Sequence, residues 1–65
     1  MNELIITYSP TNWIYYKTEQ VNVDDAYTEF ICDCENIGIN IDNMNPLSVI
    51  LRDENGNEIN RIRVW

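Results

Sequence analysis

With 65 residues, the chain has room for a single domain, residues 1–65, whose hydrophobic core must be small. Eleven acidic residues against four basic ones give a formal net charge of −7, which argues against direct binding to nucleic acid or to an anionic membrane and favours a basic partner. Small domains usually supplement a marginal core with disulfides, a metal or oligomerisation, and a chain with two cysteines and no histidine leaves oligomerisation as the expected route.

Two strands are predicted in the first part of the chain. Residues 3–8 (ELIITY) and 13–21 (WIYYKTEQV) are rich in β-branched and aromatic side chains, and the turn-forming SPTN separates them. A helix opened by Ser9 and Pro10 is the alternative, which the density of strand-forming residues disfavours. Both faces of this hairpin are predicted to be apolar. One face would carry Leu4, Ile6, Tyr8, Trp13 and Tyr15, and the other Ile5, Ile14 and Tyr16.

Residues 21–38 (VNVDDAYTEFICDCENIG) show the spacing of an amphipathic helix. Their apolar side chains recur at positions 23, 26, 27, 30, 31 and 34, which lie on one helical face. Asn22 or Asp24 is the expected N-cap, and the acids of the first turn suit the positive end of the helix dipole. Gly38 is placed to end the helix in a left-handed conformation, with Ile39 packing back on Cys34.

Residues 47–65 predict a second hairpin, with two strands that flank Asn55-Gly56 in a type I′ turn. A two-residue turn fixes the register of the strands and therefore their faces. The face predicted to meet the core pairs Val49 with Ile62, Leu47 with Val64, and Leu51 with Asn60. The opposite face would carry Ile50, Arg52, Ile59, Arg61, Arg63 and Trp65.

These elements predict an α+β fold in the order β-β-α-β-β, with one helix packed on one face of a four-stranded sheet. The order resembles the β-grasp arrangement of ubiquitin-like domains and of the immunoglobulin-binding domains of protein G. That resemblance implies that the first and last strands pair in parallel at the centre of the sheet. One helix covers one face only, so the other face is predicted to be an oligomer interface, formed by Ile14, Tyr16, Ile50, Ile59 and Trp65.

Acidic residues gather on the predicted helix. Asp25, Glu29 and Asp33 follow at i, i+4 and i+8 and form one stripe, and Asp24 and Glu35 form a flanking row. Like charges at this spacing destabilise a helix by a few tenths of a kcal/mol each. Two interpretations remain open, a solvated helix face and a partner-binding surface that imitates the phosphates of a nucleic acid.

Chemical sites are not predicted. Cys32 and Cys34 point about 200° apart on a helix, which is poor geometry for a disulfide, and without histidine they do not complete a zinc site. Residues 53–58 match the start of a calcium loop but lack its glycine at the sixth position. One lysine and no histidine leave no nucleophile–base pair. We therefore expect no metal, no cofactor and no enzymatic activity.

The composition suggests an origin and a function. Ile and Asn, with ten residues each, are favoured by A/T-rich codons and indicate a low-GC bacterium or its phage. In size and acidity the chain is similar to phage proteins that inhibit restriction, CRISPR or repair enzymes. The favoured hypothesis is an inhibitor that binds the basic nucleic-acid groove of a host defence or DNA-processing enzyme by DNA mimicry.

Two alternatives stay open. The first is a structural or scaffolding homo-oligomer that uses the sheet face, and the second is an oligomer that sequesters an anionic ligand with Arg61 and Arg63. The segment MNELIITY has an acid where a signal peptide has bases, and no apolar run approaches the roughly 18 residues of a membrane span. The expected location is the cytoplasm, that of the host for a phage protein.

Overall fold

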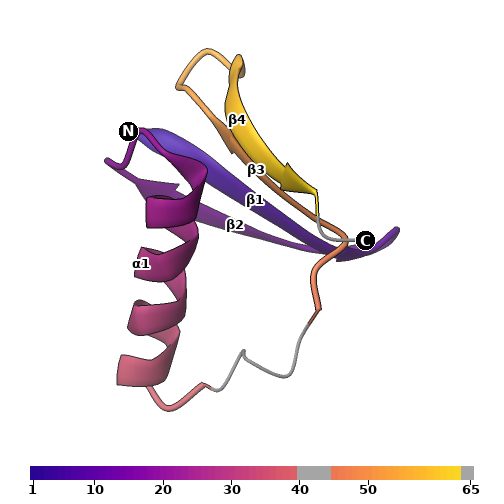
Figure 1. Ribbon diagram of the computed structural model, residues 1–65. Helices are drawn as coiled ribbons and strands as arrows, with labels where there is room; N and C mark the ends of the chain where they lie inside the picture. Colours follow the sequence, from indigo (N-terminus) through magenta and orange to yellow (C-terminus); the bar gives the residue numbers. More distant parts are fainter. Residues whose placement is uncertain (40–44, 64–65) are drawn as a thin grey trace.

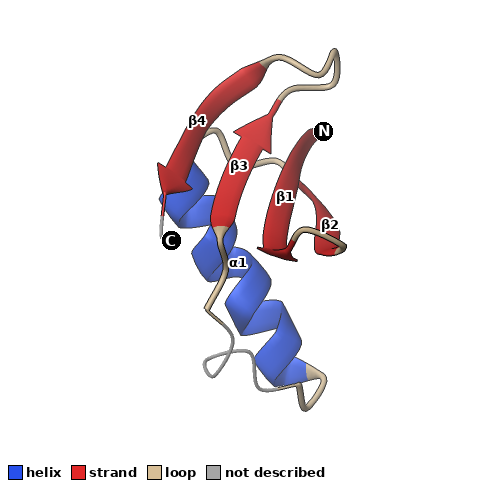
Figure 2. Cartoon of the chain, turned by 90° about the vertical axis from the view of Figure 1, so that its right-hand side faces the viewer, coloured by secondary structure: helices blue, strands red, loops and turns tan. Residues whose placement is uncertain are grey.

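The computed structural model describes residues 1–39 and 45–63 and confirms the predicted α+β fold with the order β-β-α-β-β (Figure 1). Its elements are β1 (Asn2–Ser9), β2 (Asn12–Thr18), α1 (Val23–Asn36), β3 (Ser48–Arg52) and β4 (Glu58–Arg63). The strands form one four-stranded sheet, and α1 packs on one face of it. We call the face turned away from α1, which Figure 2 shows toward the viewer, the outer face.

The sheet has the strand order β2-β1-β3-β4, and every neighbouring pair is antiparallel. The resemblance to the β-grasp fold therefore holds for the order of the elements and is wrong for the pairing, because β1 lies beside β3 and not in parallel beside β4. The composition of the strands explains the difference. β3 (SVILR) buries Val49 and Leu51 completely and is paired on both sides, whereas β4 (EINRIR) carries charged residues that a sheet edge tolerates.

The core lies between α1 and the inner face of the sheet. Its buried apolar side chains are Leu4, Ile6, Val23, Ala26, Phe30, Cys34, Val49 and Leu51. Burying a side chain of the Leu, Ile or Phe class contributes about 1.5–3 kcal/mol, so this small set is the main source of stability. Thr18 is the one buried polar residue among those described, and its hydroxyl donates a hydrogen bond to Glu29 of α1.

A β-bulge shifts the register of the first hairpin. Ser9 pairs with Asn12, and an unbroken ladder from there would place Tyr8 opposite Trp13 and so put both on one face, as the sequence predicts. Instead the register shifts by one residue between Thr7 and Ser9, and Thr7 pairs with Trp13. A one-residue shift exchanges the two faces of a strand relative to its neighbour.

The bulge decides which aromatic residues enter the core. Ile14 and Tyr16 lie opposite Ile6 and Leu4 and pack against the core. The predicted placement of Ile14 and Tyr16 on the oligomer interface is therefore wrong. Trp13 and Tyr15, which the prediction grouped with the core residues of β1, belong instead to the outer face, where the Trp13 side chain is 60 % exposed.

The second hairpin has the predicted register and a different turn. Val49 pairs with Ile62 and Leu51 pairs with Asn60, as predicted. No non-glycine residue among those described has a positive φ, which excludes the type I′ turn because that turn needs a positive φ at Asn55 as well. The Gly56 amide donates to the Asp53 carbonyl, and Gly56, with φ of 86°, opens a bulge after the turn.

Two compensating bulges explain how another turn gives the predicted register. The bulge at Gly56 moves the pairing by one residue, and a second irregularity between Leu51 and Arg52 moves it back by one, which restores the predicted register. Leu47 precedes β3 and is 43 % exposed, so its predicted place in the core is wrong. Val64 and Trp65 lie outside the described residues.

Both predicted helix caps are confirmed. The Asn22 side chain accepts hydrogen bonds from the Asp24 and Asp25 amides, which satisfies two of the free donors of the first turn. At the other end Gly38 has φ of 85°, and the Ile39 amide donates to the Cys34 carbonyl at 2.8 Å. With the Gly38 amide bonded to the Glu35 carbonyl, this is a Schellman motif.

Candidate recognition surfaces

Glu29, at the centre of the acidic stripe, joins α1 to the end of β2. The Thr18 hydroxyl donates to its carboxylate at 2.7 Å, and the Gln20 side-chain amide donates to it at 3.2 Å. The Tyr16 hydroxyl lies 3.2 Å from the same carboxylate. The hydrogen bond from Thr18, followed by that from Gln20, lowers the pKa of Glu29 below its usual 4.5. Glu29 is therefore ionised at neutral pH and held in a fixed position.

Asp33, one turn further along α1, accepts a hydrogen bond from the Tyr16 hydroxyl. Burial, and then this bond to Asp33, raise the pKa of Tyr16, so the hydroxyl stays a donor at every physiological pH. The Tyr16 ring packs edge-on against Phe30, with 5.2 Å between ring centroids. A core aromatic residue thus bonds through its polar end to the acidic stripe.

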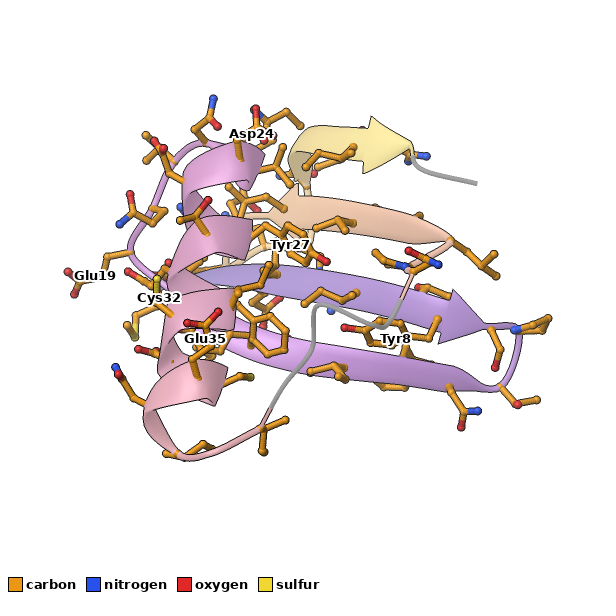
Figure 3. All side chains as sticks on the ribbon, turned by 60° about the horizontal axis from the view of Figure 1, so that its bottom comes forward. Tyr8, Glu19, Asp24, Tyr27, Cys32 and Glu35 are labelled. Atoms are coloured by element: carbon orange, nitrogen blue, oxygen red, sulfur yellow. The ribbon has the colours of Figure 1, made fainter. Side chains whose placement is uncertain are left out.

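The remaining acids of this layer are exposed. Asp24, Asp25 and Glu35 on α1 and Glu19 before it project into solvent, and Figure 3 shows Asp24 and Glu35 near the two ends of the helix. The five carboxylates of the helix form two rows on either side of an uncharged ridge that includes Cys32. We call these carboxylates, together with Glu19, the acidic layer.

The basic residues lie on the other side of the molecule. Strand register places Lys17, Arg52 and Arg61 on the outer face, and Arg63 occupies the strand position opposite Ser48. Arg52 is paired there with Glu3 at 2.9 Å, and Arg61 is paired with Glu58. Charge is therefore segregated, with an acidic helix layer and an outer face that is close to neutral.

The outer face is apolar at its centre and aromatic along β2. Ile5 and Ile50, both half-buried, pair across the central strands. Trp13 and Tyr15 are 60 % and 41 % exposed and contact each other edge-on, with ring centroids 6.5 Å apart. Of the predicted interface residues, Ile50 lies on this face and Ile59, at the β4 bulge, is 39 % exposed.

A polar cluster joins three strands at one end of this face. The Tyr15 hydroxyl donates to Glu3, and the Arg52 guanidinium lies 5.6 Å from the centre of the Tyr15 ring. The hydrogen bond from Tyr15, and then contact with Arg52, lower the pKa of Glu3. The cluster therefore keeps the two opposite charges fixed and mutually neutralised.

Each surface has a shallow cavity. One, of about 480 Å³, lies at the C-terminal end of α1 and is lined by Tyr16, Phe30, Asp33, Cys34, Asn36 and Ile37. The other, of about 310 Å³, lies on the outer face and is lined by Ile5, Thr7, Trp13, Tyr15 and Arg52. The first has an apolar floor and a carboxylate at its rim, and the second has an aromatic wall and a guanidinium.

The two cysteines lie as predicted. Cys34 is buried in the core, and Cys32, which Figure 3 labels, is exposed on the opposite side of α1. Burial raises the pKa of the Cys34 thiol, so the thiolate needed for reactivity is disfavoured. Across residues 1–39 and 45–63, no three His, Cys, Asp or Glu side chains converge in a way that could hold a metal ion. In the same residues, no helix has the length and apolar content that a membrane crossing requires.

Comparison with known proteins finds no matching family model, no similar characterised protein and no similar solved structure. Sequence reasoning placed the acids of α1 correctly on the helix but missed that Tyr16 and Thr18 hold two of them. The side chains of Tyr16 and Thr18 each end in a hydroxyl, which could have suggested hydrogen bonds to the acids of α1. The sequence did not show that these two residues of β2 face inward, because the bulge changes which residues do.

Proposed function

We propose that this chain is a small acidic protein-interaction domain that binds the basic nucleic-acid groove of a DNA-processing or host defence enzyme, as a phage-encoded inhibitor acting in the host cytoplasm. The observation that carries the proposal is the segregation of charge between the acidic layer and the outer face. Lys and Arg side chains that neutralise phosphates pair equally well with carboxylates.

The density of charge along α1 supports mimicry. A helix of 14 residues is about 21 Å long at 1.5 Å per residue, and α1 carries five carboxylates over that length. This is about one negative charge per 4 Å, close to the one per ~3.4 Å along a single DNA strand. A groove that binds a nucleic-acid strand thus meets a similar linear charge on this helix.

The fixed positions of two acids on α1 also support the proposal of mimicry. Glu29 and Asp33 are held by donors from β2, so binding a cation would not require them to be ordered first. Hydrogen bonds from neutral donors leave the negative charge in place while fixing its position. The cost of immobilising side chains, about 0.5–1.5 kcal/mol each at an interface, is reduced for these two acids.

The cavity at the end of α1 offers an anchor for one basic side chain. Its apolar floor, which includes Phe30, suits the aliphatic stem of a lysine or arginine, and Asp33 at the rim suits the charged end. The last turn of α1 has no basic residue, so the negative end of the helix dipole is free to favour the same cation.

The test neutralises exposed acids of α1 and leaves Glu29 and Asp33, which are held by β2, unchanged. Reversal of Glu29 or Asp33 would break the contacts with β2 and confuse binding with folding. The binding variant is therefore Asp24→Asn, Asp25→Asn, Glu35→Gln. The matched control is Glu54→Lys, Asn55→Lys in the hairpin turn, which also reduces the net negative charge by three units on exposed residues away from α1.

The measurement is capture of proteins from a lysate of a low-GC bacterium on the immobilised chain, with duplex DNA as competitor. We expect the captured protein to be released by DNA and by salt, to be lost with the α1 variant, and to be retained with the turn variant. Equal binding by both variants, or capture that DNA does not displace, would contradict the proposal.

The outer face favours a second candidate function, that of a structural or scaffolding homo-oligomer, because Trp13 and Tyr15 are exposed there. In that case function would survive neutralisation of α1 and be lost on substitution of Ile50 by glutamate. Sequestration of an anion by Arg61 and Arg63 gains no specific support, since the Arg61 guanidinium is paired with Glu58.

A further inference from the structure

We propose that the outer face binds a second copy of this chain, with a twofold axis that runs along the strands between β1 and β3. The inference rests on the register of the sheet and is independent of the function proposed for the acidic layer. A second copy is the expected occupant because the residues of the outer face complement the same residues of another chain.

Strand pairing arranges the outer face in three rows that cross the sheet from β2 to β4. The first row contains Trp13, Thr7 and Ser48, with Arg63 at the last strand position; the second contains Tyr15, Ile5, Ile50 and Arg61; and the third contains Lys17, Glu3, Arg52 and Glu58. Each row holds one residue from every strand. The order β2-β1-β3-β4 places two strands on each side of a line between β1 and β3.

A rotation of 180° about that line lays β2 of one copy over β4 of the other and keeps each row over itself. In the middle row, Ile5 of one copy then packs on Ile50 of the second, and the Tyr15 ring lies over the Arg61 guanidinium. The first contact buries apolar surface at the centre of the interface, and the second is a cation–π contact. Sheets stacked face to face tolerate this layout because their strands stay within about 30° of each other.

The third row is complementary in charge under the same rotation. Lys17 of one copy would meet Glu58 of the second, and Glu3 would meet Arg52. A twofold axis across the strands would instead bring Arg61 over Arg61 at the β4 edge, where like charges oppose each other. The register therefore favours one of the two symmetric ways to stack these sheets.

Charge also selects this face over the rest of the surface. Two chains that each carry a net charge of −7 repel each other. Five of the acids lie on α1, on the side of the sheet opposite the outer face. The outer face is close to neutral, so stacking there keeps the acidic layers apart and directs both outward (Figure 1). Contact through α1 would bring the two acidic layers together.

The expected interface is small. Four strands at about 4.8 Å spacing and three rows at about 7 Å give roughly 400 Å² of projected area per copy. Side-chain relief makes the accessible area larger, which places the dimer near the lower limit of about 1,000 Å² for a specific interface. We therefore expect a dimer that dissociates on dilution.

Sedimentation velocity over a range of concentrations tests the association. The wild-type chain is expected to shift from the 7.7 kDa monomer to a species of twice that mass and to stop there, since a twofold interface closes. Ile5→Glu should remove the dimer. The matched control, Val21→Glu, changes an apolar residue that is 72 % exposed outside the sheet and should leave it intact. Far-UV circular dichroism verifies that each variant is folded.

A charge-swap cycle tests the axis. Lys17→Glu and Glu58→Lys should each weaken the dimer. In the double variant the two symmetric ion pairs form again with their charges exchanged, so its dissociation constant should be about fivefold lower than the two single effects together would give. Within one copy, Lys17 and Glu58 lie on opposite edges of the sheet, about 14 Å apart across three strand spacings, so they do not couple there.

Four results would overturn the proposal. They are a mass of 7.7 kDa up to millimolar concentration, growth beyond the dimer, an equal loss of dimer in Ile5→Glu and Val21→Glu, and a dimer in which the charge swap shows no recovery. Trp13 gives an independent readout in a Trp65→Phe background. Its fluorescence should shift to the blue as the dimer forms, since the ring leaves water, and an unchanged spectrum across the transition would contradict the interface.

Discussion

Replacing Glu29 with alanine is expected to destabilise the protein more than the loss of any other carboxylate of α1. Thr18 is 1 % exposed, and its hydroxyl donates to Glu29 at 2.7 Å. Without that acceptor a buried donor is unsatisfied, which costs about 1–3 kcal/mol. The longer bond from Gln20 adds less than about 1 kcal/mol because it is partly exposed. The expected loss in the free energy of unfolding is therefore about 2–3 kcal/mol.

That loss is large for a domain of this size. Sixty-five residues imply a total stability of roughly 3–10 kcal/mol, and each kcal/mol lowers the melting temperature by about 4–8 °C. Thermal and urea unfolding followed by far-UV circular dichroism should show a decrease of roughly 10–20 °C. Asp25→Ala, in the same stripe and exposed, is the control and should cost less than about 1 kcal/mol. If the two variants differ by less than about 0.5 kcal/mol, the role assigned to Glu29 is wrong.

Three further outcomes are expected. Acidification should reduce stability less in Glu29→Gln than in the wild type. The folded pKa of Glu29 is lowered, so its contribution is present above the unfolded value of 4.5 and is lost as the pH falls through the lower folded pKa, which urea titrations between pH 7 and 3 can follow. Asn22→Ala, which removes the N-cap, and Gly56→Ala, which forces a side chain into a positive φ, should each cost about 1 kcal/mol in urea unfolding. A thiol reagent should label Cys32 in the native protein and Cys34 only on unfolding, and equal labelling rates would contradict the burial of Cys34.

The helix and its caps could be predicted because their signals are local. The apolar spacing, Asn22 before the first turn and Gly38 after the last each act within a few residues, and the structure has all three in place. Strand pairing depends on contacts that are distant in the chain. β3 lies beside β1 because Val49 and Leu51 are completely buried there. Whether this pairing is preferred over others depends on all the strands together, so it cannot be predicted from the sequence of one segment.

The candidate site was partly predictable for a related reason. The acids of α1 were recognised from their spacing, but the role of Glu29 depends on Tyr16 and Thr18, and their orientation depends on the bulge before Ser9. A bulge adds one residue without any change in composition, so the alternation of WIYYKT reads equally well with either face inward. The aromatic residues of the outer face were missed for the same cause.

The two proposed surfaces do not compete for the same residues. Stacking of two outer faces would bury Ile5, Ile50 and Tyr15 and leave both acidic layers on the outside of a particle with the layers α-β-β-α. Such a particle would present two copies of α1 to two basic grooves or to two segments of one groove, and the second contact would then form at a raised effective concentration. Ile5→Glu would remove that gain while α1 stays intact, whereas neutralising Asp24, Asp25 and Glu35 would remove binding and leave the dimer. The separation of charge across this fold therefore predicts that one variant loses the dimer and keeps binding through α1, and that the other loses binding and keeps the dimer.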